Sequence, residues 1–373
     1  MKSIVVRRTA LSLPGAVLLS LVLASQALAA TWSAPMPLTS SGIAFAKALG
    51  TLGNSTVIAV YIEHTPDMPN FPFTYALKIR RSTDSGLSWA PPLKLSKDAL
   101  NADIATRGSV VDVVWDQGDT NRIRYARSLD GGLTFDPPVA LSPKGKRAWN
   151  PSVARGPDGV VAVAWENLNT GHVNVRVSTD GGTSFAPQVP VAIAAYDMGV
   201  EVAVGQGVIY VAYAEDFDEL HIRRSTDDGM TWSPAIPITN NLYGVHEQVS
   251  LTAVANRAYL AYAIRTGSGN ADVKYRRSTD HGASWGGEMA LSPVAWDSWE
   301  PDIAVQGGVL RAVFTRRGSP YRVFYRQSSD GVNWAAPEKA AAMGYEASVG
   351  FAGKGIVLYR VGTGDAYVVT RTP

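Results

Sequence analysis

The chain has 373 residues, no cysteine, and a formal net charge of +2 from 34 lysines and arginines against 32 aspartates and glutamates. The lack of cysteine excludes disulfides, thiol catalysis and cysteine-ligated zinc, so a hydrophobic core must stabilise the fold alone. The small net charge does not suggest a basic face, and we expect no nucleic-acid partner.

The first 29 residues have the pattern of a secretory signal peptide. A basic start (Lys2, Arg7, Arg8) precedes an apolar run, Ala10 to Ala24, and Ala27-Leu28-Ala29 offers small residues at a cleavage site. The apolar run is shorter than the roughly 20 residues that a spanning helix needs, so we expect no membrane insertion. Removing three bases leaves a mature chain of about −1. The sequence therefore predicts a secreted or periplasmic protein.

One pattern, Ser-x-Asp-x-Gly followed by an aromatic residue, recurs through the rest of the chain. Its copies are Arg81–Trp89, Arg127–Phe135, Val177–Phe185, Arg224–Trp232 and Arg277–Trp285, with a shorter one at Gln327–Trp334. A regular period of this length indicates stacked or circular repeats. The Ser and Asp side chains can accept hydrogen bonds from the backbone N–H groups that follow, and Gly suits a positive φ. We call these segments the Asp turns and expect a structural role for them.

Each repeat contains the same order of strand-forming segments. An apolar segment is followed by a strongly β-forming run, an alternating strand that enters the Asp turn, and a short last strand. Such runs, punctuated by Gly, Pro and Asp, are typical of strands and hairpins, and no long helical periodicity follows the signal peptide. The sequence therefore predicts an all-β protein, a β-propeller of four-stranded antiparallel blades.

The number of blades depends on the two ends of the chain. Six Asp turns suggest six blades, but Thr31 to Thr39 matches the last strand of a repeat, with Trp32 in the place of Trp89. After Trp334 three more strand-like segments follow, and they stop at Arg371, where another Asp turn would begin. We predict seven blades, with six as the alternative, in one domain over residues 30–373. The N-terminal strand would close the last blade, and we expect a monomer.

The pattern Ser-x-Asp-x-Gly-x-x-Trp resembles the Asp-box (BNR) repeat of the sialidase-like propellers. Five copies fit it, with Phe for Trp in two, and the copy at Ser328 is one residue shorter, with Val332 where Gly is expected. The resemblance covers essentially all of the mature chain and implies a propeller fold. Proteins of this kind include exo-sialidases, other glycosidases, lectins and non-enzymatic assembly factors.

The ends of the second strands change character around the predicted ring. Blades one to four end in the acids Glu63, Asp116, Glu166 and Glu215, and blades five to seven end in Arg265, Arg316 with Arg317, and Arg360. We expect these positions on the face opposite the Asp turns, where arginines from consecutive blades are a candidate carboxylate clamp. The resemblance implies the same chemistry, because active sialidases use an arginine triad. Ordinary solvated loop arginines are the alternative.

The loops that lead into the first strands contain aromatic and acidic residues, and we expect these loops on the same face. Trp149, Trp296, Trp299 and Tyr243 are candidate platforms for sugar rings, although they could instead plug the mouth of the ring.

The resemblance also implies a Tyr/Glu nucleophile pair and an Asp acid/base. The candidates are Tyr345 with Glu346 or Glu300, and Glu63 or Asp116 as the acid. The first blade reads SGIAFAKALG, without the Arg-Ile-Pro that sialidases carry.

No metal or cofactor is expected. The five histidines show no metal-ligand spacing, and the acidic loops 116–121 and 215–219 are interpreted as solvated loops in preference to calcium sites. The leading hypothesis is a secreted propeller that binds a glycan or glycoconjugate. The alternatives are an exo-sialidase-type glycoside hydrolase acting on an anionic sugar, and a protein-binding scaffold without enzymatic activity.

Overall fold

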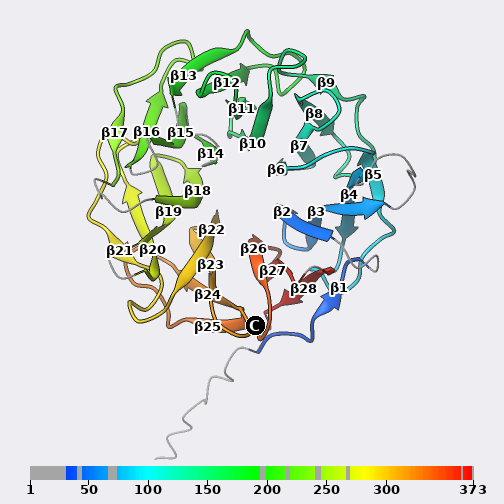
Figure 1. Ribbon diagram of the computed structural model, residues 1–373, viewed down its shortest axis with the longest axis vertical. Helices are drawn as coiled ribbons and strands as arrows, with labels where there is room; N and C mark the ends of the chain where they lie inside the picture. Colours follow the sequence, from blue (N-terminus) through cyan, green and yellow to red (C-terminus); the bar gives the residue numbers. More distant parts are fainter. Residues whose placement is uncertain are drawn as a thin grey trace, which may run out of the picture. The chain divides into compact units, whose positions relative to one another are not determined.

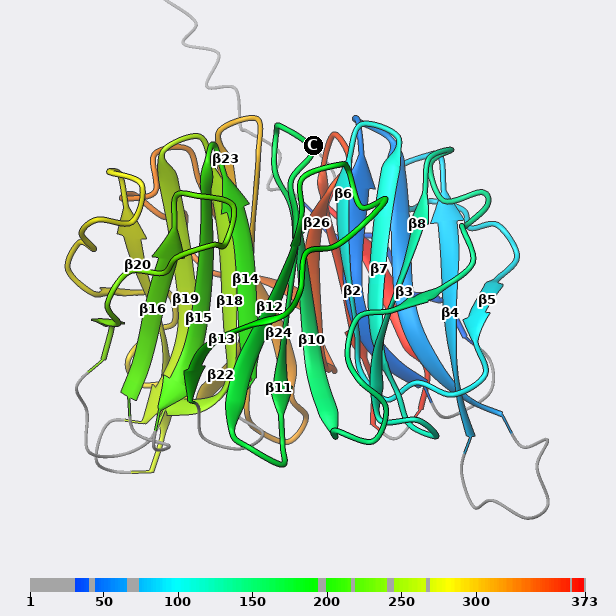
Figure 2. The ribbon, with the colours of Figure 1, turned by 90° about the horizontal axis from the view of Figure 1, so that it is seen from above.

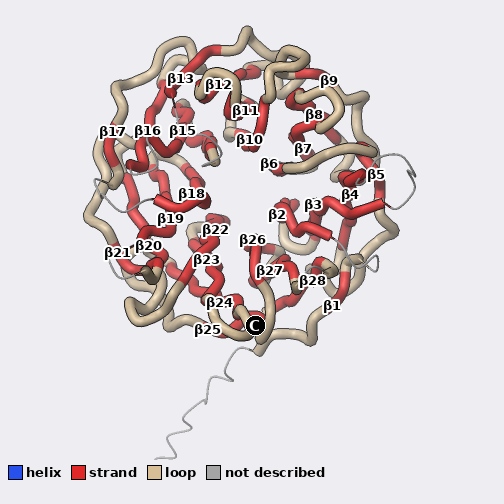
Figure 3. The backbone as a smooth tube through the Cα atoms, viewed as in Figure 1, coloured by secondary structure: helices blue, strands red, loops and turns tan. Residues whose placement is uncertain are grey.

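The computed structural model describes residues 31–39, 44–65, 74–193, 199–215, 219–239, 245–265, 269–362 and 364–371. The predicted signal peptide and Tyr243 lie outside these ranges. The described residues form seven four-stranded antiparallel sheets, arranged as the blades of a β-propeller (Figure 1). Figure 3 shows strands joined by loops, with no helix among the described residues. The predicted fold class and blade number are confirmed.

The four strands of each blade are ordered outwards from a central channel. The innermost strands are β2 (Ala44–Leu52), β6 (Ala102–Arg107), β10 (Ala148–Arg155), β14 (Val200–Gly205), β18 (Val245–Val254), β22 (Ser298–Gln306) and β26 (Tyr345–Phe351). The second strands are β3 (Thr56–Thr65), β7 (Val110–Gln117), β11 (Val161–Asn167), β15 (Val208–Glu215), β19 (Arg257–Arg265), β23 (Val309–Arg316) and β27 (Gly355–Arg360).

The outer half of each blade is built in the same way. The third strands are β4 (Thr74–Ser82), β8 (Arg122–Ser128), β12 (His172–Ser178), β16 (Glu219–Ser225), β20 (Ala271–Ser278), β24 (Arg322–Ser328) and β28 (Ala366–Thr370). The outer strands are β5 (Leu93–Ser96), β9 (Val139–Ala140), β13 (Val189–Ile193), β17 (Ile236–Pro237), β21 (Met289–Ala290), β25 (Glu338–Ala341) and β1 (Met36–Pro37). Blades 1 to 7 are numbered in the order of their innermost strands.

The ring is closed by pairing the two ends of the propeller domain. Strand β1 adds to the edge of β28 with Met36 opposite Val368, and Trp32 bridges Arg371 beyond it. A buried cluster then joins blade 7 to blade 1, with Leu358 and Val57 among its members. Because this pairing covers an otherwise open sheet edge, it confirms the predicted sharing of the last blade between both ends of the domain.

The hydrophobic core lies between neighbouring blades. One buried cluster combines valines and alanines of β11 and β12 in blade 3 with Val, Ile and Tyr side chains of β14 and β15 in blade 4. Each fully buried Val, Leu or Ile side chain contributes roughly 1.5–3 kcal/mol to this packing. The β-branched runs that predicted the second strands therefore form the walls between blades.

The Asp turns have the predicted geometry. The Ser82 hydroxyl donates to Asp84 Oδ1 at 2.7 Å and accepts the Gly86 N–H at 2.8 Å, while Asp84 Oδ1 accepts the N–H groups of Leu87 and Ser88. Gly86 has a φ of 83°. In the shortened copy the backbone adapts, because Gly331, with a φ of 69°, donates to Ser328 in the place of the expected glycine.

Candidate functional site

Antiparallel pairing brings the predicted site residues to one face of the ring. Trp149 pairs with Glu166, Ser298 with Arg316, and Tyr345 with Arg360, so the first strands begin where the second strands end. The Asp turns lie at the other end, where for example Gly131 donates to the carbonyl of Ser109 in the adjacent inner hairpin. We call the two ends the mouth face and the turn face; Figure 2 shows the strands running between them.

Three blades carry the same strained bulge at the mouth face. The pairing register shifts after Trp149 in β10, after Trp299 in β22 and after Tyr345 in β26. The next residues, Asn150, Glu300 and Glu346, have φ values of 47°, 55° and 49°. Such left-handed conformations cost non-glycine residues roughly 1–3 kcal/mol and are concentrated at functional sites. Three polar side chains held at this cost mark the mouth as the candidate site.

Glu300 links two of these bulges. Its Oε2 accepts the backbone N–H of Glu346 at 2.6 Å and the Thr315 hydroxyl at 2.8 Å. Burial raises the pKa of Glu300, against the effect of these two hydrogen bonds, and the Glu346 carboxylate raises it further. Glu300 and Glu346, both predicted as candidate catalytic residues, are therefore neighbours at the mouth.

Arg360 lies beside the same pair. Its guanidinium approaches Glu346 Oε1 at 3.3 Å and lies 4.1 Å from the centre of the Phe45 ring and 5.5 Å from that of Tyr345. The Tyr345 hydroxyl donates to the carbonyl oxygen of Gly362. This hydroxyl therefore faces a loop backbone, and Arg360 is already partnered by a carboxylate.

Asp116 organises the neighbouring side of the mouth. Its side chain is 1% exposed and accepts the backbone N–H groups of Leu100, Asn101 and Asn150 together with the Asn101 side-chain amide. Burial raises its pKa, and the hydrogen bonds from Asn101 oppose that shift. This geometry holds loops of blades 2 and 3 together. The other candidate acid, Glu63, is buried in an ion pair with Lys78.

Lys47 connects the two sides and was not recognised from the sequence. It lies at the bulge of β2, where the register shifts between Ala46 and Ala48, and its ammonium donates to Asn101 Oδ1 at 3.0 Å. Burial lowers the pKa of Lys47, while the Glu346 and Asp116 carboxylates raise it and Arg360 lowers it further. The mouth therefore combines two cations with carboxylates and amides.

The other predicted arginines stack on tryptophans. Arg316 lies 4.5 Å from the centre of the Trp296 ring, while Arg317 and Arg265 lie 3.9 and 5.1 Å from that of Trp299. The four arginines are thus distributed over several aromatic rings, with Arg265 and Arg317 sharing one. Trp299 is only 8% exposed, so its ring contacts these arginines and presents little surface to a ligand. Trp296 and Trp149 are half-buried.

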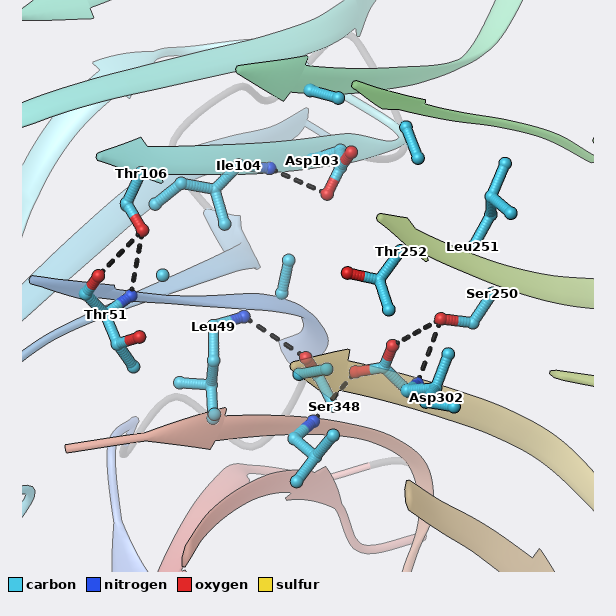
Figure 4. A pocket seen from close by; sticks show the side chains of 18 of the residues that line it. Leu49, Thr51, Asp103, Ile104, Thr106, Ser250, Leu251, Thr252, Asp302 and Ser348 are labelled. Carbon is cyan, nitrogen blue, oxygen red and sulfur yellow. Dashed lines mark hydrogen bonds between the residues drawn. The ribbon is translucent and has the colours of Figure 1, made fainter. Parts of the chain in front are cut away.

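Below the mouth, a cavity of about 740 Å³ is lined by the innermost strands of all seven blades. Equivalent positions of six consecutive blades alternate between an acid and a serine. In chain order they are Asp103, Ser152, Glu201, Ser250, Asp302 and Ser348. We call this ring the channel belt; Figure 4 shows part of it.

The belt holds successive blades together. Asp302 accepts the Ser250 hydroxyl at 2.7 Å and the Val349 N–H at 2.8 Å, and Ser348 accepts the Leu49 N–H at 3.2 Å. Burial raises the pKa of Asp103 to about 6, and the hydrogen bonds that its carboxylate accepts oppose this shift. Burial, and then the charge of Asp103, also raise the pKa of Glu201.

Two further findings concern the described residues alone. No group of three or more His, Cys, Asp or Glu side chains among them is arranged to hold a metal ion. None of their secondary-structure elements is a helix long and apolar enough to cross a bilayer.

Comparison with solved structures shows that the chain is similar in fold to known β-propeller proteins. The chain superposes on the BP39L lectin from Burkholderia pseudomallei with a TM-score of 0.66 and 13% identity, over 87% of this chain and 96% of the lectin. For the Hadza microbial sialidase Hz136 the TM-score is 0.53 at 17% identity, over 73% of this chain and 63% of the sialidase. An ulvan lyase of a polysaccharide lyase family gives 0.56 at 12% identity, over 89% and 94%.

The chain thus spans less than two thirds of the length of that sialidase. No protein-family model and no curated protein matches the sequence. At these identities the structural likenesses establish the fold and leave the activity to be argued from the site.

Proposed function

We propose that this protein is an exported, sialidase-like propeller of the Asp-box type that binds carbohydrate at the mouth of its channel. The observation that carries the proposal is the strained bulge repeated in three blades, which places Asn150, Glu300 and Glu346 at the mouth face. Carboxylates, amides and cations gathered over a cavity suit the hydroxyl groups and charged substituents of a sugar. The lectin, sialidase and lyase neighbours are in keeping with a glycan ligand.

A glycan array followed by calorimetry tests this proposal. The wild-type protein should bind a defined set of glycans, and Glu346→Gln should weaken that binding at least tenfold because the carboxylate beside Arg360 is neutralised. The matched control is Glu338→Gln, since Glu338 is also partly exposed and also pairs with an arginine, Arg371, but lies in outer strand β25. An array without hits would contradict the proposal and favour a protein-binding scaffold.

A second candidate is an exo-sialidase-type hydrolase acting on an anionic sugar. It is favoured by the adjacency of Tyr345, Glu346, Glu300 and Arg360. This function predicts release of a fluorogenic sialoside aglycone that is lost in Arg360→Ala and in Arg316→Ala. Absence of turnover over a broad pH range would reject the enzyme and leave the binding function standing.

A further inference from the structure

Two groups of basic side chains flank the mouth, on different blades. The first, which we call the blade 2–3 rim, consists of Arg122, Arg124, Lys144, Lys146 and Arg147. Lys144, Lys146 and Arg147 are exposed, and Arg122 and Arg124 are half-buried at the start of β8. None of the five forms an ion pair with another described residue. Arg124 instead donates to Gln117 Oε1 at 2.7 Å.

The loop that carries these lysines is fixed in place. Gly145 donates to the carbonyl of Thr120 at 3.1 Å, and Leu168 donates to the carbonyl of Arg147 at 3.0 Å. The loop is thus tied to both blades just before Trp149 and the strained bulge of β10. The acids near it are Asp98 and Asp119, where Asp98 Oδ2 accepts the Asp119 N–H at 2.5 Å, and the buried Asp116 and Glu166, so the five exposed or half-buried bases outnumber them. The rim therefore keeps an excess of positive charge.

The second group, the blade 5–6 rim, consists of Arg265, Arg316, Arg317 and Arg322. Arg316 and Arg322 are paired residues at the ends of β23 and β24. Three of the four guanidinium groups stack on Trp296 or Trp299, as described above, and none of the four forms an ion pair within the described ranges. Stacking orients a guanidinium and lowers its entropy loss on binding, while its N–H groups stay available for an anion.

The two rims lie on opposite sides of the channel. In Figure 1, β8 and β10 are across the ring from β20, β23 and β24. Between the rims lies the mouth, where the carboxylates of Glu300 and Glu346 stand beside Lys47 and Arg360. Across the mouth face the charge pattern is therefore basic, then mixed and polar, then basic again.

We propose that the mouth face binds an anionic polysaccharide chain that crosses the channel mouth and is anchored by its carboxylate or sulfate groups at both rims. This rests on the proposed function, because the central sugars of the chain would occupy the mouth. A ligand held at two separated anchors gains affinity through effective concentration, so a chain long enough to span both rims binds more tightly than a short one.

The pattern favours a polysaccharide over a nucleic acid. A nucleic-acid strand carries a charge at every nucleotide, roughly one per 3.4 Å in each strand of a duplex, and would place phosphates against the mouth carboxylates. A polysaccharide can carry its charges farther apart and present hydroxyl groups between them. Carboxylates and amides such as those of Glu346 and Asn150 are acceptors and donors for hydroxyl groups.

The test compares long and short fractions of polygalacturonate, dextran sulfate, neutral dextran and single-stranded DNA by calorimetry at two salt concentrations. One variant pair, Lys144→Gln with Lys146→Gln, weakens the blade 2–3 rim; a second, Arg317→Gln with Arg322→Gln, weakens the other. The control pair, Arg107→Gln with Arg257→Gln, removes two exposed arginines of the inner hairpins on the turn face.

Each rim pair should lower the affinity for a long polyanion about tenfold and reduce its salt dependence, with short fragments little affected and the control pair unchanged. Preference for polygalacturonate or for dextran sulfate identifies a carboxylate or a sulfate as the anchored group. Equal affinity for long and short fractions, or tighter binding of single-stranded DNA, would overturn the inference. If short fragments do not bind the wild type but rim-dependent binding of long chains persists, the proposed function of the mouth fails and the polymer is held by the rims alone.

Discussion

The carboxylate of Glu300 accepts the backbone N–H of Glu346 at 2.6 Å, so the strained bulges of blades 6 and 7 are coupled directly. The same oxygen accepts the Thr315 hydroxyl. Glu300→Ala should lower the free energy of unfolding by about 1–3 kcal/mol, because two donors lose their acceptor. Glu300→Gln keeps an acceptor oxygen and should lose less. Urea denaturation of the two variants measures the difference, and equal losses would mean that the carboxylate charge, not the hydrogen bonds, stabilises the bulge.

Glycine variants that relieve backbone strain can distinguish the effect of a residue on stability from its effect on binding. Glu346 and Ala255 both adopt a left-handed conformation, with φ values of 49° and 51°, but Ala255 lies in an exposed hairpin on the turn face. Glycine adopts this conformation without a steric penalty. Ala255→Gly should raise the melting temperature by a few degrees and leave glycan binding intact. Glu346→Gly should keep a melting temperature near that of the wild type and abolish binding; retained binding would remove Glu346 from the site.

A buried ion pair joins blades 2 and 3 at a position where blades 6 and 7 use a different contact. Arg155 Nη2 donates to Asp112 Oδ1 at 2.8 Å, and the Asp112 side chain is fully buried. At the equivalent position the guanidinium of Arg311 lies 3.2 Å from the centre of the Phe351 ring. Both contacts place an arginine at a blade interface, once against a carboxylate and once against an aromatic face.

Arg155→Met should lower the free energy of unfolding by about 3–5 kcal/mol, because Asp112 is left as an uncompensated buried charge. Adding Asp112→Leu to this variant should recover part of the loss, since apolar packing replaces the pair while the Tyr125 hydroxyl, which donates to Asp112 Oδ1 at 2.5 Å, loses its acceptor. Chemical denaturation of the two single variants and the double variant gives the coupling energy. Additive losses would show that the pair does not act as a unit.

Two glycines with the same backbone conformation, Gly182 in an Asp turn and Gly159 in the turn between β10 and β11, differ in what surrounds them. Gly182 and Gly159 both have a φ of 84°, but a Cβ on Gly182 would lie 1.9 Å from the Tyr125 hydroxyl, whereas nothing lies within 4 Å of one on Gly159. Gly159→Ala should therefore cost about 1 kcal/mol from backbone strain alone. Gly182→Ala should cost clearly more or prevent folding, as measured by denaturation and by yield of soluble protein. Equal costs would show that Tyr125 can move aside.

The architecture could be predicted because the Asp turn repeats in nearly every blade, and a repeated residue such as Gly182 reports a shared backbone requirement. The acids and bases of the mouth could be placed on one face for the same reason. The channel belt was missed because its residue type alternates from blade to blade. In addition, bulges before Ser152 and Asp302, but not before Asp103, change the number of residues between the start of the innermost strand and the belt residue. That Arg317 and Arg265 would share one tryptophan depends on side-chain packing, which a repeat alignment does not reveal.

The pH dependence of stability should have two parts, because two kinds of aspartate are shifted in opposite directions. Hydrogen bonds from the hydroxyl and N–H of Thr231 and from Ser225 lower the pKa of Asp227, in an Asp turn, to about 2. Its stabilising contribution is present above its unfolded pKa, near 3.9, and is lost as the pH falls towards 2. Burial instead raises the pKa of Asp103, in the channel belt, to about 6.

The contribution of Asp103 is therefore fully present below its unfolded pKa and is lost as the pH rises from about 4 to about 6. Glu201 is shifted in the same direction, and the two titrate together, so the loss belongs to the belt as a group. The melting temperature should be highest in mildly acidic buffer and decline towards neutral pH. Asp103→Asn should flatten that decline while leaving the acid limb of the curve unchanged. A wild-type melting temperature that does not change between pH 4 and 7 would show that the belt carboxylates are solvated well enough to ionise without cost.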